Sequence, residues 1–105
     1  MGKKSAIDSL SKVIANVIVH KVLLRYTNKP ESVSHLNYEV TEYRDTAISK
    51  AEKFNWNKSD KEEIKSNAWR YFKSKMNTRY RDVMFPMKEA VRFLNQTMEE
   101  IGIGW

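Results

Sequence analysis

The chain has 105 residues, enough for one domain with a modest hydrophobic core and too few for two. It contains no cysteine, which excludes disulfides and thiolate metal sites, and its two histidines cannot form a closed zinc site by themselves. The formal net charge of +6 favours polyanionic partners without identifying one.

Glycine is absent from the interior of the chain. The only glycines are Gly2, Gly102 and Gly104, all of them near an end. Tight hairpins usually need residues that accept positive φ, whereas long helices do not. The sequence therefore predicts an all-α fold: a single four-helix bundle-like domain with a short basic N-terminal arm and an apolar C-terminal tail.

The first predicted helix covers about residues 5–26, with Ser5 as its N-cap and Asp8 complementing the positive N-terminal end. Apolar residues occupy most of its circumference, so it must be buried in the core or against another copy of the chain. Asn16 and His20 are separated by four residues on this helix. They can form an internal polar pair that sets the register between helices or subunits.

Two further helices are predicted after Pro30, which cannot continue the first helix. The second covers about residues 34–55, where apolar residues recur at steps of three and four. The third covers about residues 60–84. Ser59, just before this helix, and Glu62, in its first turn, have the spacing of a capping box.

A fourth helix is predicted over about residues 86–101, because Pro86 stops the third. Gly102 then occupies the C′ position, where a left-handed backbone closes many helices. Ile103 and Trp105 lie beyond the helix. An exposed apolar end is unfavourable in water, so we expect them to pack onto the body or onto a neighbour.

The third predicted helix carries the best candidate for a binding site. Between Lys65 and Arg81 the chain has basic residues and no acidic one. Arg70, Lys73, Asn77 and Arg81 fall at steps of three, four and four, which places them on one face. Such a face can neutralise a row of phosphates, although a solvated helix surface is the plain alternative. With a basic arm at the N-terminus, the candidate nucleic-acid-binding residues are Lys3, Lys4, Lys65, Arg70, Lys73, Lys75, Asn77, Arg79 and Arg81.

A second set of residues is predicted to join copies of the chain. Trp56 lies in a turn and Trp105 at the end of the chain, and tryptophan is enriched in protein–protein contacts. The apolar first helix offers a further surface. The candidate self-association residues are Ile18, Val22, Trp56, Ile103 and Trp105.

The sequence contains no motif that indicates catalysis. There is no Gly-rich phosphate loop and no nucleophile elbow. The Glu39–Glu42 and Glu62–Glu63 pairs have no histidine or cysteine close enough in sequence to act with them.

The N-terminal apolar stretch is too interrupted for a secretory signal or a membrane span. We therefore expect a non-enzymatic protein that is not secreted, with no metal, no cofactor and no small-molecule substrate.

The layout of the chain resembles that of the small coat proteins of filamentous and rod-shaped DNA viruses of archaea. The shared features are a basic start (MGKKS), a hydrophobic first helix, a basic helix flanked by aromatic residues (KSNAWRYFKSKMNTRYR) and an apolar end (IGIGW). The resemblance implies a major coat protein of a virion. Its copies would wrap double-stranded DNA in a self-assembled filament, with or without a related second chain. A cellular protein of this kind would be expected in the cytoplasm.

Two other functions fit the same sequence. A dimeric helical protein-interaction module would use the apolar first helix and the tryptophans as its interface, and its basic face would be incidental. A small helix-turn-helix regulator would place a short recognition helix in the major groove. The third predicted helix is long for that role, and no glycine-containing turn precedes it.

Overall fold

The computed structural model describes residues 2–26 and 33–104 of the chain. They form four α-helices: α1 (Lys3–Tyr26), α2 (Val33–Ala51), α3 (Lys58–Arg79) and α4 (Met87–Glu100). These ranges contain no strand, which confirms the predicted all-α fold. Within the same ranges, no helix combines the length and the apolar character that a membrane span requires.

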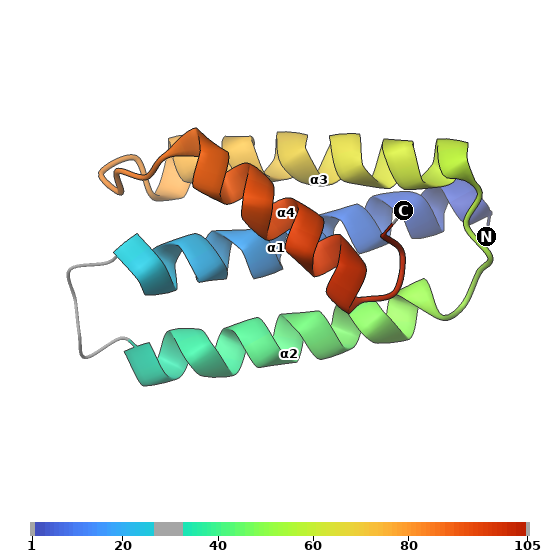
Figure 1. The fold of residues 1–105 in the computed structure, drawn as a ribbon, viewed down its shortest axis with the longest axis horizontal. Coiled ribbons are helices and arrows are strands. Elements are labelled where there is room, and N and C mark those ends of the chain that lie inside the picture. The colour runs from blue at the N-terminus through green and yellow to red at the C-terminus, as the bar shows by residue number, and fades with distance from the viewer. Residues whose placement is uncertain (1, 27–32, 105) are drawn as a thin grey trace.

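Helix α1 lies at the centre of the molecule, with α2 on one side and α3 on the other (Figure 1). Helix α2 runs antiparallel to α1, α3 runs in the same direction as α1, and α4 crosses obliquely over α1 (Figure 1). The α3–α4 connection therefore lies at one end of the molecule, and the α2–α3 connection lies at the other.

Three helices cover α1, and this explains its unusually apolar sequence. Burying one large aliphatic side chain stabilises a fold by about 1.5–3 kcal/mol, so α1 supplies much of the driving force for folding. The large aliphatic side chains of α1 that are completely removed from solvent are Leu10, Ile14, Val17, Ile18 and Val22. The apolar surface that suggested a second copy is thus covered by the chain's own α2, α3 and α4.

The other helices each bury one stripe, as their periodicity predicts. On α3 the buried residues are Ile64, Ala68, Phe72 and Met76, at steps of four, and they face the core. On α2 they begin at Leu36 and end at Ala51. The opposite face of α3 is left to solvent, and this decides which of its cations are accessible.

The N-cap of α3 is Asn57, two residues earlier than the predicted cap, Ser59. The Asn57 side-chain oxygen accepts from the Asp60 backbone N–H at 2.8 Å, and the Asp60 carboxylate accepts from the Asn57 N–H at 3.1 Å. This reciprocal pair is a capping box. The predicted Ser59–Glu62 cap is therefore wrong, because Asn57 is an equally good N-cap and Asp60 completes it.

Helix α3 ends at Arg79, earlier than the predicted end near residue 84. The Val83 N–H donates to the Tyr80 carbonyl at 3.1 Å and forms a turn. This turn carries the chain back onto the core, where Tyr80, Val83 and Phe85 pack while half-buried. Burial of these three side chains competes successfully with a further turn of helix.

The C-terminus of α4 closes as predicted, with Gly102 at C′. Its φ is 84°, and its N–H donates to the Glu99 carbonyl at 3.0 Å. The Ile103 N–H donates to the Met98 carbonyl at 3.0 Å, which completes a Schellman motif. Ile103 is only 3% exposed and packs in the core. Trp105 lies outside the described residues.

Candidate nucleic-acid interface

The solvent face of α3 carries three of the residues predicted to bind phosphate. Arg70, Lys73 and Asn77 are all exposed, opposite the stripe that packs on α1. Arg79 is exposed at the last helical residue, where a cation also complements the helix dipole. Arg81 is exposed in the turn beyond the helix end, so the prediction that it continues the helical register is wrong. The basic face is defined here as Arg70, Lys73, Asn77, Arg79 and Arg81.

The cations of the basic face differ from most of those on α1 and α4. Within residues 2–26 and 33–104, the charged groups of Arg70, Lys73, Arg79 and Arg81 take part in no ion pair. The paired basic residues are Lys3, Lys12, Lys21, Arg25 and Arg92, each of which contacts a carboxylate. The basic face therefore has positive charge that the described carboxylates do not neutralise by contact.

Arg70 is the member of the basic face with the closest internal contacts. Its guanidinium lies 5.4 Å from the centre of the Tyr71 ring. The Tyr71 hydroxyl donates to the Asp8 carboxylate, and Lys12 Nζ lies 3.3 Å from Asp8 Oδ2. The Tyr71 hydrogen bond, followed by Lys12, lowers the pKa of Asp8 below its ordinary value, with a smaller contribution from Arg70. Asp8 therefore remains ionised and offsets part of the Arg70 charge.

Lys75 faces α1 and is not part of the exposed surface. Its Nζ donates to the side-chain oxygen of Asn16, and the side chain is half-buried. Burial lowers the pKa of Lys75, and the nearby Arg79 charge lowers it further. The ammonium group of Lys75 thus already serves the α1–α3 contact, and its contact with phosphate stays a prediction.

Lys65 also lies away from the basic face. It is half-buried on the side of α3 that meets α4, where it lines the groove next to Trp69 and Leu94. Lys65 and Arg70 therefore do not form one continuous surface along α3.

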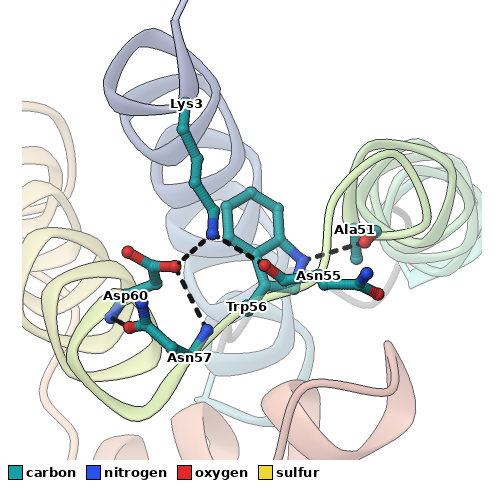
Figure 2. A network of polar contacts seen from close by, with 6 residues as sticks. All are labelled: Lys3, Ala51, Asn55, Trp56, Asn57 and Asp60. Atoms are coloured by element: carbon teal, nitrogen blue, oxygen red, sulfur yellow. Dashed lines mark hydrogen bonds and ion pairs between the residues drawn. The ribbon is translucent and has the colours of Figure 1, made fainter.

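Lys3 is fixed to the start of α3, as Figure 2 shows. Its Nζ lies 2.6 Å from Asp60 Oδ2 and 2.7 Å from the carbonyl of Asn55, which accepts its hydrogen bond. The same group lies 5.7 Å from the centre of the Trp56 ring. The predicted basic arm is therefore wrong: Lys3 and Lys4 belong to the first turn of α1, and only Lys4 is exposed.

Asn16 and His20 form no side-chain pair with each other. His20 Nδ1 lies 2.7 Å from the backbone carbonyl of Asn16, and its Nε2 contacts the Glu39 carboxylate on α2. His35 Nε2 lies 2.7 Å from the other Glu39 oxygen. Glu39 thus has two histidine partners, His35 four residues earlier on α2 and His20 on α1, so the prediction that no histidine lies close enough in sequence to act with it is wrong. Within the described residues, no group of side chains has the arrangement of a metal site.

Most of the predicted self-association residues lie inside the molecule. Ile18, Val22 and Ile103 are buried in the chain's own core, which corrects the expectation that they face another copy. Trp56 is half-buried, and its Nε1 donates to the Ala51 carbonyl at 2.9 Å (Figure 2). Trp105 lies outside the described residues, so its role stays a prediction.

A cavity of about 380 Å³ opens beside the basic face, at the junction of α3 and the 80–87 segment. Lys73, Asn77 and Arg81 belong to both the basic face and the cavity wall. The rest of the wall is aromatic or aliphatic, formed by Phe72, Met76, Tyr80, Val83, Met84, Phe85 and Met87. The sequence interpretation missed this cavity because it extended α3 to about residue 84. The signal for it is the aromatic and methionine-rich VMFPM segment just before α4.

Comparisons with family models, curated proteins and solved structures find no match to this chain. The function must therefore be inferred from the geometry of the residues themselves. The inference below uses the basic face and the cavity that shares three of its residues.

Proposed function

We propose that this protein is a non-enzymatic nucleic-acid-binding protein that contacts the phosphate backbone through the basic face, without sequence preference. The observation that carries the proposal is a group of four exposed cations in the second half of α3 and the turn after it, none of which pairs with a described carboxylate: Arg70, Lys73, Arg79 and Arg81. Contacts to phosphate supply most non-specific affinity for nucleic acid.

The chemistry of the basic face suits phosphate better than it suits base edges. Guanidinium groups bind phosphate oxygens in a fixed fork, and the Lys73 ammonium adds a point charge. Asn77 is exposed between them and can donate to a phosphate oxygen. Phosphate contacts carry no sequence information, so this surface predicts binding without sequence preference.

The charge along α3 gives the surface a direction. Glu62 and Glu63 are exposed near the start of the helix, and the cations of the basic face follow in its second half and in the turn. The Lys58 end therefore carries charges of both signs, whereas the Arg79 end has an excess of cations that attracts a polyanion. Lys88, exposed in the first turn of α4, adds charge near the attractive end.

Packaging or coating of nucleic acid is the extended form of the proposal. A few phosphate contacts per copy give weak binding to one site, and many copies on one strand or duplex bind far more tightly. The wrapping of double-stranded DNA in a virion filament follows from the layout resemblance and stays a prediction. Because α1 is already covered, a contact between copies would have to use other surfaces.

Competition binding with variants of the full chain tests the proposal. Replacing Lys73, Arg79 and Arg81 together by glutamine should weaken binding to a random-sequence duplex by about 100-fold at low salt. The matched control replaces Lys50, Lys53 and Lys58 by glutamine, which removes the same charge at the opposite end of α3.

The control variant should bind nearly as well as the unaltered chain, and duplexes of unrelated sequence should compete equally. If the control loses as much affinity as the basic-face variant, net charge alone explains the binding. If the unaltered chain fails to bind any duplex or single strand at low salt, the proposed function is wrong.

A further inference from the structure

We propose that the basic face binds single-stranded nucleic acid and that the adjoining cavity takes one unpaired base of the strand. This inference rests on the proposed function and narrows it from nucleic acid in general to strands with accessible bases. The observation behind it is that Lys73, Asn77 and Arg81 are shared between the basic face and the cavity wall.

The size and lining of the cavity suit a planar apolar group. Its volume of about 380 Å³ falls in the range of roughly 300–1,000 Å³ that small-ligand pockets occupy. Such pockets are mostly apolar with a few convergent polar groups, and this one follows that pattern. Its polar lining comes from Lys73, Asn77 and Arg81, beside apolar and aromatic side chains.

The charge of the side chains that line the cavity indicates the charge of the ligand. Two cations, Lys73 and Arg81, line the cavity, and no aspartate or glutamate is part of its wall. Negative charge at the rim is therefore favoured for a ligand that places an apolar group inside. A nucleotide unit of a single strand has this combination, with its base attached close to a phosphate.

The aromatic rings of the cavity differ in accessibility. Phe72 is fully buried and meets Phe85 edge-on, with ring centres 5.7 Å apart and an interplanar angle of 73°. Tyr80 and Phe85 are half-buried, so their rings remain accessible from the cavity. A base that stacks on either ring gains affinity that does not depend strongly on its identity.

Two exposed methionines form the outer wall of the cavity. Met84 is 83% exposed and Met87 is 52% exposed, which is unusual for large apolar side chains. Methionine is flexible and polarisable, so it adapts to the shape of a planar ligand. A base in the cavity would cover this apolar surface.

Duplex nucleic acid cannot use the cavity in this way. In a duplex the bases are stacked and paired, and moving one out of the stack requires a few kcal/mol. A single strand presents its bases already accessible for stacking on aromatic side chains. The inference therefore predicts stronger binding to single strands than to duplexes of equal charge, which differs from the duplex expected by resemblance.

An abasic oligonucleotide separates base binding from phosphate binding. It retains the phosphate charge of a single strand and lacks the bases. We expect the full chain to bind a random-sequence single-stranded oligonucleotide about 10-fold more tightly than the abasic oligonucleotide of the same length. Tyr80→Leu should reduce this preference severalfold, whereas Tyr38→Leu, a change of an exposed tyrosine on α2, should leave it unchanged.

Oxidation of Met84 gives a second readout that does not depend on a variant folding. With the unaltered chain, the single strand should slow the conversion of Met84 to its sulfoxide, and the abasic strand should slow it much less. Mass spectrometry of peptides follows both reactions.

The outcomes distinguish the two proposals. Equal binding of the single strand and the abasic strand, or equal protection of Met84 by both, overturns the base-binding inference and leaves the phosphate-binding proposal standing. Tighter binding of a duplex than of a single strand also overturns the inference. Failure to bind any of the three at low salt overturns the proposed function, and the inference with it.

Discussion

Lys3 and Asp60 form an ion pair of 2.6 Å that joins the first turn of α1 to the first turn of α3. Asp60 at the same time accepts the N–H of Asn57 in the capping box. One carboxylate thus fixes the start of α3 and its position against α1 (Figure 2). Lys3, which was predicted to belong to a basic DNA-binding arm, therefore joins two helices instead.

The Lys3–Asp60 pair predicts a dependence of stability on pH. The Lys3 contact, followed by the Asn57 N–H, lowers the pKa of Asp60 below its ordinary value of 3.8. A lowered carboxyl pKa stabilises the fold above the unfolded-state pKa, and this contribution is lost as pH falls through the folded-state pKa. Lys3→Met should therefore lower the free energy of unfolding more at about pH 6 than at about pH 3, measured by urea unfolding.

Asp45→Asn is the control for this pH effect, because Asp45 is exposed on α2 and contacts no cation in the described chain. It should behave like the unaltered chain at both pH values. An equal loss of stability at the two pH values in Lys3→Met would show that the ion pair does not carry the effect.

The capping box predicts a contrast between two neighbouring positions. Asn57→Ala removes the acceptor for the Asp60 N–H and should lower the free energy of unfolding by about 1 kcal/mol. Ser59→Ala should change it by less than about 0.5 kcal/mol, because Ser59 is exposed inside the first turn and is not the cap. Thermal and urea unfolding measure both, and a larger effect at Ser59 would refute the assignment.

The backbone conformation of Gly102 predicts that an alanine at this position destabilises the fold without a steric clash. Its φ of 84° is unfavourable for a residue with a Cβ, while an added Cβ would meet no atom within 4 Å. Gly102→Ala should therefore lower the free energy of unfolding by about 1–2 kcal/mol through backbone strain alone. Gly2→Ala, where space is also open and φ is not positive, should have almost no effect.

Lys73 and Lys75 are predicted to have different roles although only one residue, Ser74, lies between them. Lys75→Met leaves the Asn16 side-chain oxygen without its donor and should lower the free energy of unfolding by about 1 kcal/mol, with little change in nucleic-acid affinity. Lys73→Met should weaken nucleic-acid binding and leave stability nearly unchanged. Paired unfolding and binding measurements check this, and loss of affinity in both variants would contradict it.

Helical periodicity predicted α2, α3 and α4 well because each of these helices packs along one continuous stripe. On α3 the buried stripe runs from Ile64 to Met76 at steps of four, as expected for a helix with one buried face. The same stripe explains why Lys75, directly beside Met76, faces α1 while Lys73 faces solvent. Composition alone treats both as members of one basic run.

Contacts between side chains on different helices could not be predicted from the hydrophobic pattern of the sequence. Glu39 contacts His20 only because α1 and α2 pack in one particular register. The end of α3 depends on whether Tyr80 and Phe85 gain more from the core than from another helical turn. The cavity beside the basic face follows from that early end, and so it was missed as well.

The salt dependence of nucleic-acid binding tests the central claim most directly. Each neutralised phosphate contributes about −0.9 to the slope of log K against log salt for duplex DNA, and about −0.7 for single strands. For the four cations of the basic face, Arg70, Lys73, Arg79 and Arg81, the predicted slope is about −3.5 on duplex and about −3 on single strands. The variant with Lys73, Arg79 and Arg81 replaced by glutamine should show a slope near −1 on either. An unchanged slope in that variant would contradict the assignment of the basic face as the phosphate-binding surface.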